Sequence, residues 1–354
     1  MKKIAFFDAK PYDKIWFEKY KNEYNLELIY YENKLNSDTA FMVAGRDGAG
    51  RDGAGCDGAV AFVNDIIDEK VIKVLYENGI KILALRSAGF NNVDFNAAFG
   101  KIHVVRVPAY SPYAVAEHAL ALLLTLNRKI HRAYNRTREY NFSLVGLQGF
   151  DLNGKTAGVI GTGMIGQVFI NICKGLGMKV VAYDPFPSKG KDIEYVSTEE
   201  LYKRSDVISL HCPLTKDTHH MINAKSINMM KDGVYILNTS RGAIINSEAL
   251  LNAIKSGKIG GAGLDVYEEE SVLFYEDFSN SIMQDDVLAR LVSMPNVIVT
   301  SHQGFFTNEA LQNIAKTTLE NLNAFYKDEP LDNEICYQCT KNSNCDKKHN
   351  QRCF

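Results

Sequence analysis

Short apolar runs alternate with longer amphipathic segments over the first 108 residues of the chain. The segment 69–78, for example, separates two apolar runs and has the polar and apolar spacing of a helix. Strands that are apolar on both faces and alternate with helices are typical of a parallel sheet covered by helices. We therefore predict an α/β domain with strands at 3–8, 26–31, 59–63, 82–86 and 103–107.

A long helix is predicted to begin at Ser111-Pro112, because serine caps helix amides and proline suits the first helical position. Its apolar face covers 114–126, and a basic stretch, 128–138, follows. We place a domain junction just before this helix, because a second alternation of strands and helices begins after it. A helix at 310–326 should then return the chain to the first domain. The strands of the second block are expected at 156–160, 179–183, 207–210, 234–238, 261–264 and 297–300.

The composition is that of a globular protein with two domains. The 354 residues suffice for two cores, and 46% hydrophobic with 23% charged residues is typical of soluble chains. A formal net charge of −2 gives no basic field for nucleic acid or an anionic membrane. The longest apolar stretch, 114–126, contains Glu117 and His118 and is too short to span a bilayer. The N-terminus does not fit a signal peptide, so we expect a cytoplasmic protein.

A short glycine-rich tandem repeat occupies residues 44–59, where Asp-Gly-Ala occurs three times. A glycine loop that binds phosphate needs a preceding strand and a following helix, whereas here a strand follows. Glycine in this density is costly inside a helix or strand. We therefore predict a flexible surface insertion.

Residues 161–166, Gly-Thr-Gly-Met-Ile-Gly, fit the dinucleotide-binding pattern Gly-x-Gly-x-x-Gly. A predicted strand precedes the motif, a helix begins within it, and the next strand ends in Asp184, 23 residues after Gly161. The three glycines permit a tight turn, a close approach of the backbone to the pyrophosphate, and close packing of helix and strand. Asp184 can accept hydrogen bonds from the ribose hydroxyls of NAD and would repel the extra phosphate of NADP. The predicted cofactor is therefore NAD.

Side chains suited to a hydroxy-acid substrate follow the later strands, at the ends where open parallel sheets bind ligands. Arg241 can bind a carboxylate through two hydrogen bonds, and His211 or His302 can transfer a proton near neutral pH. A carboxylate behind such a histidine would orient its ring. Spacing alone does not distinguish the two histidines, although Pro213 suggests that His211 lies in a turn lining the cofactor. It also does not distinguish the glutamates at 268–270, two of which could form a solvated acidic turn.

Several longer stretches carry a family resemblance. They include Leu-Arg-Ser-Ala-Gly-Phe-Asn-Asn-Val-Asp at 85–94, Asn-Thr-Ser-Arg-Gly-Ala at 238–243 and Ser-His-Gln at 301–303. The chain resembles the D-isomer-specific 2-hydroxyacid dehydrogenases, and within them the fermentative D-lactate dehydrogenases. The resemblance extends to about residue 335, and the glycine-rich repeat and the tail depart from the family pattern. The remaining matching stretches are 105–112, 116–118, 155–163, 210–214, 264–268 and 285–287.

The resemblance implies roles for individual residues. Arg241 would bind the substrate carboxylate and polarise the carbonyl, His302 would be the acid/base, and Glu270 would be its carboxylate partner. Asp265 would lie by the nicotinamide and support the site, whereas His211 would be a residue on the cofactor side. The further substrate contacts implied are Ala88, Gly89, Tyr110 and Phe305. Phe305 and Phe306 together would close the pocket. The cofactor contacts expected are Gly161, Gly163, Met164, Ile165, Gly166, Asp184, His211, Cys212, Pro213, Thr239 and Asp265.

The same resemblance implies the architecture. A Rossmann NAD-binding domain, 109–304, would be inserted into a flavodoxin-like substrate domain made of 1–108 and 305–335. Both would be doubly wound parallel sheets, and a cysteine-rich tail, 336–354, would follow. The helix from Ser111 is usually a dimer contact in such proteins, so a homodimer or homotetramer is expected.

These implications predict a D-lactate dehydrogenase that reduces pyruvate to D-lactate with NADH. One alternative is reduction of a bulkier 2-keto acid such as 2-ketoisocaproate. Another is a non-catalytic NAD(H)-sensing regulator or scaffold, which the same fold can serve. The intact set of Arg241, Glu270 and His302 argues against this last alternative.

The seven cysteines form two groups. Cys56, Cys173 and Cys212 are scattered and should pack as small apolar groups. The other four, with His349 among them, have the spacing Cys336-x2-Cys339-x5-Cys345-x7-Cys353. Such a cluster can bind zinc or an iron–sulfur centre, but this spacing fits no standard pattern. A reduced or redox-active tail is therefore favoured, with a metal site as the alternative.

Overall fold

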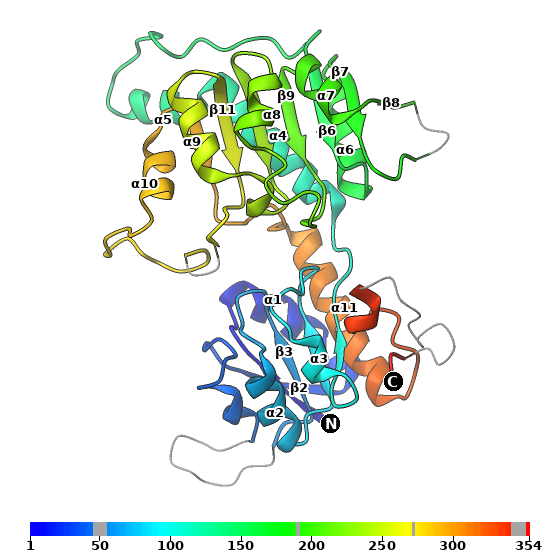
Figure 1. Cartoon of the computed structure of the whole chain (residues 1–354). Coiled ribbons are helices and arrows are strands. Elements are labelled where there is room, and N and C mark those ends of the chain that lie inside the picture. Colours follow the sequence, from blue (N-terminus) through cyan, green and yellow to red (C-terminus); the bar gives the residue numbers. More distant parts are fainter. Residues whose placement is uncertain (45–54, 189–191, 271–272, 341–351) are drawn as a thin grey trace. The chain divides into compact units, whose positions relative to one another are not determined.

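The structure is a computed structural model, and it describes residues 1–44, 55–188, 192–270, 273–340 and 352–354. The chain divides into two compact units (Figure 1). The first comprises Met1–Ser111 with Thr307–Phe354, and the second comprises Pro112–Phe306. Each unit has its own parallel sheet, which confirms the predicted α/β class with two parallel-sheet domains.

The first unit is built on five parallel strands. Its elements are β1 (Lys2–Phe6), α1 (Pro11–Tyr20), β2 (Leu26–Tyr30), β3 (Gly58–Ala61), α2 (Glu69–Glu77), β4 (Ile82–Leu85), α3 (Phe95–Ala98), β5 (His103–Val105), α11 (Asn308–Tyr326) and α12 (Tyr337–Thr340). The strand order β2-β1-β3-β4-β5 is that of flavodoxin-like folds. The strands are apolar on both faces because helices cover both. Helices α1 and α11 pack on one face through Phe17 and Leu319, and α2 packs on the other through Val71 and Leu75.

The second unit is built on seven parallel strands (Figure 1). Its elements are α4 (Pro112–Arg128), α5 (Ile130–Arg138), β6 (Thr156–Ile160), α6 (Met164–Gly175), β7 (Lys179–Tyr183), β8 (Glu194–Tyr195), α7 (Thr198–Arg204), β9 (Val207–Leu210), α8 (Ala224–Met229), β10 (Val234–Asn238), α9 (Ser247–Lys255), β11 (Ile259–Leu264), α10 (Asp286–Ser293) and β12 (Val297–Val299). The order β12-β11-β10-β9-β6-β7-β8 contains the strand order of dinucleotide-binding folds, with its reversal between β6 and β9. Side chains of α4 and α6 pack on one face of the sheet, and those of α7 to α10 pack on the other.

The glycine-rich repeat continues into the first sheet. Most of it, 45–54, lies outside the described residues, so the predicted insertion is untested there. Gly58, however, begins β3 and pairs with Ile4 of β1, so the prediction is wrong for this residue. A Cβ at position 58 would lie 2.6 Å from the hydroxyl oxygen of Tyr326 on α11. This close approach explains why a glycine occupies the strand.

The three scattered cysteines, Cys56, Cys173 and Cys212, are buried in apolar surroundings, as predicted. None of the cysteines that the structure describes takes part in a disulfide. Within the described residues, no helix has both the length and the apolar character needed to cross a membrane.

Candidate active site

The glycine loop lies between β6 and α6, at the carboxyl end of the central strands. Gly161 has a φ of +91°, and a Cβ there would lie 2.6 Å from the carbonyl carbon of His211. A Cβ on Gly166 would lie 2.0 Å from the carbonyl oxygen of Gly161. Gly163, in contrast, faces open space, since a Cβ there would have no heavy atom of the described chain within 4 Å. The first and third glycines therefore serve the turn and the packing, and the second leaves room beside the helix terminus, where a pyrophosphate is favoured.

Asp184 lies at the end of β7 and is held against this loop. Its Oδ2 accepts hydrogen bonds from the backbone N of Thr162 at 2.7 Å and from Thr162 Oγ1 at 3.1 Å. Its Oδ1 accepts one from the backbone N of Phe186 at 2.8 Å. Tyr195 of β8, a strand that the sequence did not predict, contacts Thr162 Oγ1 at 3.0 Å. The carboxylate is thus fixed beside the motif, as a ribose acceptor requires.

Replacing Asp184 with alanine should weaken NADH binding by roughly 10- to 100-fold, because a hydrogen bond to a charged acceptor contributes about 1.5–3 kcal/mol. NADPH should lose less affinity or gain some, since the repulsion of its extra phosphate is removed. Fluorescence titration with both cofactors measures the change in preference.

Asp232→Ala is the matched control, because this exposed carboxylate precedes β10 at the opposite edge of the sheet. An equal loss for both cofactors in Asp184→Ala would indicate a collapsed loop. An unchanged preference for NADH would show that selectivity lies elsewhere.

His211 follows β9 and is partly buried behind the glycine loop, with its Nδ1 shielded from solvent. Its Nε2 lies 2.8 Å from Ser209 Oγ, and its ring packs against Phe169 of α6 at 5.1 Å between centroids. Burial lowers the pKa of His211 to about 4, so the ring is neutral at physiological pH. A buried neutral ring suits a supporting residue better than a proton donor. This favours His302 over His211 as the acid/base.

The depressed pKa of His211 predicts a loss of stability in acid. The folded form resists protonation below the unfolded pKa of about 6.5, so the stability present above that pH is lost as the pH falls toward 4. Between pH 7.5 and pH 5 the contribution of His211 should fall by about 2 kcal/mol. Thermal unfolding followed by circular dichroism at both pH values measures the loss. The variant His211→Gln should lose clearly less, and an identical acid sensitivity would contradict the assignment.

Arg241 lies in a rigid turn after β10. Asn238 Nδ2 donates to the carbonyl of Arg241 at 2.9 Å, and Ser240 Oγ donates to the carbonyl of Cys212. A Cβ at position 242 would lie 2.0 Å from the carbonyl of Tyr267, so only glycine fits there. The half-buried Arg241 side chain therefore extends from a backbone that is fixed on both sides.

His302 follows β12 and is paired with Glu270. The Nδ1 of its ring lies 3.0 Å from Glu270 Oε1, and Glu270 Oε2 accepts the backbone N of Tyr267 at 2.9 Å. This pairing leaves Nε2 of His302 as the nitrogen available to a substrate. The backbone of His302 has a φ of +52°, an uncommon conformation for a residue other than glycine. The hydrogen bond from its N to the carbonyl of Asp265, at 2.7 Å, and that from Tyr275 Oη to its own carbonyl, at 3.1 Å, hold it there. Such strain is typical of functional positions.

Asp265 organises the turn that carries His302. The carboxylate is 1% exposed and accepts hydrogen bonds from Thr300 Oγ1 at 2.5 Å and from the backbone N of Gln303 and of Gly304 at 2.9 and 2.7 Å. His118 Nε2 of α4 lies 3.1 Å from the same carboxylate. Asp265 thus holds the turn that carries His302 in place. Its predicted position by the nicotinamide stays a prediction. His118 and Thr300 were missed as functional residues, although 116–118 was one of the matching stretches.

The family model described as D-isomer specific 2-hydroxyacid dehydrogenase, NAD binding domain, matches residues 120–304. The chain is also 48% identical to the D-lactate dehydrogenase of Escherichia coli strain K12, over 94% of this chain and 99% of that protein. The chain belongs to this family. The predicted family and the NAD cofactor are thereby confirmed, and the chain is an NAD-dependent oxidoreductase.

Solved structures of family members have the same fold. The pyruvate reductase of Chlamydomonas reinhardtii has a TM-score of 0.87 at 42% identity, with 94% of this chain and 98% of that chain covered. A D-2-hydroxyisocaproate dehydrogenase has a TM-score of 0.82 at 34% identity, with 94% and 99% covered. The 2-hydroxyacid dehydrogenase fold therefore extends over nearly the whole chain.

The three glutamates that look alike in the sequence have different surroundings in this dehydrogenase. Glu270 pairs with His302. Glu268 instead pairs with His220, which lies in the segment between β9 and α8. Glu269 is exposed. Among the three glutamates, only Glu270 contacts His302. Glu269 alone is solvated in the way that the alternative of an acidic turn supposes.

The other predicted cofactor residues lie around the same edge of the second unit. Cys212 and Thr239 are buried at the ends of β9 and β10, and Pro213 is exposed beside them. Met164, at the start of α6, is 61% exposed. Their contacts with NAD stay predictions.

Two of the predicted substrate residues of the first unit, Ala88 and Gly89, lie in a loop after β4, and Tyr110 follows β5. Ser87 Oγ donates to the carbonyl of Gly89 at 2.9 Å, and Arg106 Nη1 donates to the carbonyl of Ala88 at 2.8 Å. The carbonyl of Tyr110 accepts from Asn313 Nδ2 at 2.7 Å. In the second unit, Phe305 is buried and Phe306 is half exposed. Substrate binding by Ala88, Gly89, Tyr110 and Phe305 stays a prediction.

Proposed function

We propose that this dehydrogenase reduces pyruvate to D-lactate with NADH. The observation that carries the proposal is the set of residues at one edge of the second sheet. His302, Glu270 and Arg241 follow β12, β11 and β10, which are neighbours in the sheet and parallel. A cation for the carboxylate and an acid/base pair for the carbonyl oxygen therefore come from adjacent strand ends.

The chemistry divides between the cofactor and these side chains. NADH supplies the hydride that is added to the carbonyl carbon of pyruvate. His302, protonated and oriented by Glu270, donates a proton from Nε2 to the carbonyl oxygen as negative charge develops there. Arg241 binds the carboxylate through two hydrogen bonds and so selects the face of the carbonyl that reacts. One pyruvate, one NADH and one proton give one D-lactate and one NAD⁺.

Comparison of kcat/KM across 2-keto acids tests the substrate. Pyruvate should be preferred to 2-ketoisocaproate, because the chain is 48% identical to a D-lactate dehydrogenase and 34% identical to a D-2-hydroxyisocaproate dehydrogenase. A higher kcat/KM for 2-ketoisocaproate would move the assignment to the bulkier substrate. Tight NADH binding without turnover of any 2-keto acid would instead favour the NAD(H)-sensing regulator.

We also propose that the first unit is the substrate domain and that the enzyme acts in the cytoplasm as a homodimer or homotetramer. Exposed apolar side chains around α5 and the segment after it support the oligomer, because large exposed apolar patches mark interaction surfaces. They are Tyr134, Tyr140, Phe142, Leu144 and Val145, each more than half exposed. Light scattering after gel filtration measures the subunit number.

A further inference from the structure

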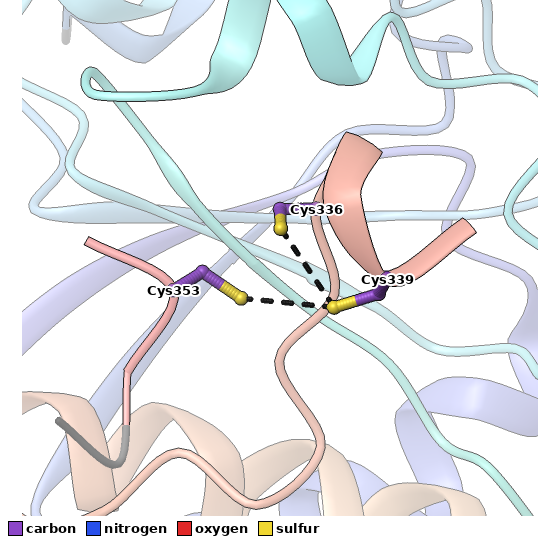
Figure 2. Close-up of side chains that lie close together, drawn as sticks. All are labelled: Cys336, Cys339 and Cys353. Atoms are coloured by element: carbon purple, nitrogen blue, oxygen red, sulfur yellow. Dashed lines mark hydrogen bonds between the residues drawn. The ribbon is translucent and has the colours of Figure 1, made fainter. Parts of the chain in front are cut away.

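Three cysteines of the tail come together in the first unit (Figure 2). Cys336 and Cys339 lie on either side of the start of α12, and their Sγ atoms are 3.7 Å apart. Cys353 Sγ lies 4.0 Å from that of Cys339, and all three sulfurs are within 4.8 Å of one another. Cys336 and Cys353 are almost fully buried, at 3% and 1% exposure. The cluster is therefore an interior group of three thiols.

Residues 352–354, which include Cys353, are held in place by several independent contacts. The backbone N of Cys353 donates to Glu334 Oε2 at 2.6 Å, and the other oxygen of this buried carboxylate lies 2.6 Å from His103 Nδ1. The ring of Phe354 stacks on that of His103, with centroids 4.2 Å apart. Arg352 Nη2 donates to the carbonyl of Glu329 at 3.0 Å. These contacts fix the backbone on both sides of Cys353 and so keep the third thiol beside the other two.

The near side of the cluster is anchored as well. The backbone N of Ile335 donates to the carbonyl of Val104 at 2.9 Å, and Glu334 pairs with Val105 at the edge of the first sheet. Cys336 follows directly and immediately precedes α12. Thiols separated by 17 positions in the sequence are thus brought together by fixed backbone on both sides.

The distances between the sulfurs fit one metal ion. Zn–S bonds of about 2.3 Å at tetrahedral angles place thiolates about 3.8 Å apart. A disulfide needs sulfurs about 2.05 Å apart and would leave one of three thiols over. An iron–sulfur cluster spreads its thiolates over several iron atoms, so its sulfurs are farther apart than the edge of one tetrahedron.

We propose that Cys336, Cys339 and Cys353 bind one Zn²⁺ ion through their three thiolates, with the fourth position taken by a ligand other than these three. Each thiol releases its proton as its Zn–S bond forms, which gives the three thiolates and the ion a net charge of −1. Arg106 lies close enough to interact electrostatically with Cys339 and can offset this charge. The ion would link positions 336, 339 and 353 and so hold residues 352–354 on the first unit. This proposal does not depend on the substrate of the enzyme.

Metal analysis of the full-length chain without an affinity tag tests the proposal. The protein is incubated with Zn²⁺ and a phosphine reductant, desalted and measured by plasma mass spectrometry. The wild type should retain about one zinc per chain, and Cys339→Ala and Cys353→Ala should each lose most of it. Cys56→Ala, a buried cysteine of the same unit outside the cluster, is the matched control and should retain the metal.

Two further readouts keep the test valid if a variant folds poorly. Cobalt added to the wild type in place of zinc should give thiolate-to-cobalt charge-transfer bands and the visible spectrum of a tetrahedral site. The unfolding midpoint reported by Trp16, the single tryptophan, which lies in α1 of the first unit, should fall by roughly 5 °C or more after zinc is chelated. Readdition of zinc should restore it.

Several results would overturn the proposal. They are a wild type that retains no zinc, equal retention in the cluster variants, copper bound in preference to zinc, and loss of two thiols to a disulfide in protein without metal. An unchanged unfolding midpoint after complete removal of bound zinc would show that the ion does not hold residues 352–354 on the first unit.

Discussion

Replacing Arg241 with alanine should lower kcat/KM for pyruvate by about 10³-fold, through a lower kcat and a higher KM together. Removing one preorganised hydrogen-bond donor from a developing oxyanion costs about 2.7–4 kcal/mol in well-studied active sites. Arg241 has two tasks, since it binds the carboxylate in the ground state and polarises the carbonyl in the transition state. Loss of the first raises KM, and loss of the second lowers kcat. The turn itself should survive, because Asn238 contacts the backbone of residue 241 and not its side chain.

Steady-state kinetics with pyruvate at saturating NADH measures this effect. Arg204→Ala is the matched control, because Arg204 is an arginine of the same unit that pairs with Glu194 on the surface, and its loss should leave the kinetics unchanged. Arg241→Lys should recover only part of the activity, because lysine keeps the charge but cannot form the two parallel hydrogen bonds. Near-normal kinetics in Arg241→Ala would contradict its role in the reaction.

The sequence predicted most strands of the second sheet, but it did not predict the short strand β8. Strands β6, β7, β9 and β10 have the predicted bounds, because each is a mostly apolar run that a polar or glycine residue ends. The two-residue strand β8 was missed, because so short a segment has no periodicity. The role of Gly58 was misjudged, because a glycine is needed there to leave room for Tyr326, which lies 268 positions later in the sequence. Local patterns do not contain such contacts.

The site could be predicted in its chemistry but not in its pairings. The positions after the predicted strands indicated Arg241, His302 and three adjacent glutamates as site residues. The family resemblance then identified Glu270 among the three glutamates. The physical reason is tertiary, because Glu268 is engaged by His220 and Glu269 faces solvent. His118 supports Asp265 from 147 positions earlier in the chain, and no local signal reveals that contact.

A second large effect is expected in the first unit, where Arg86 is buried among carboxylates at the end of β4. Its Nη2 donates to the carbonyl of Asp8 at 2.6 Å and lies 3.4 Å from Asp13 Oδ2 and 3.7 Å from Asp8 Oδ2. Arg86 and both aspartates are at most 3% exposed. The guanidinium also stacks over Phe62, 3.9 Å from the ring centroid. Asp8 also pairs with Lys10 Nζ at 2.9 Å, so Arg86 is the fully buried cation of a network that contains both aspartates.

Arg86→Met should therefore destabilise the first unit by about 3–5 kcal/mol, the usual cost of leaving buried charges without their partner. Urea unfolding followed by Trp16 fluorescence reports on this unit, because Trp16 lies in α1. Lys73→Met is the matched control, because it breaks a solvent-exposed ion pair with Glu77 and should cost less than about 1 kcal/mol. Equal effects of the two substitutions would show that the buried network contributes no more than a surface pair.

The pH dependence of the same variant separates lost charge compensation from lost packing. Burial raises the pKa of Asp13, and Arg86 opposes that rise, so the pKa of Asp13 should rise further in Arg86→Met. A carboxyl whose pKa is higher in the folded state than in the unfolded state favours folding at low pH, and this stability is lost as the pH rises through the folded pKa. The destabilisation by Arg86→Met should therefore be smaller at pH 5 than at pH 8, and Asp13→Asn in the same chain should recover part of it. If the loss of stability is equal at both pH values and unaffected by Asp13→Asn, it comes from poor packing of the methionine side chain. Neither the pH nor Asp13→Asn is expected to alter the packing around residue 86.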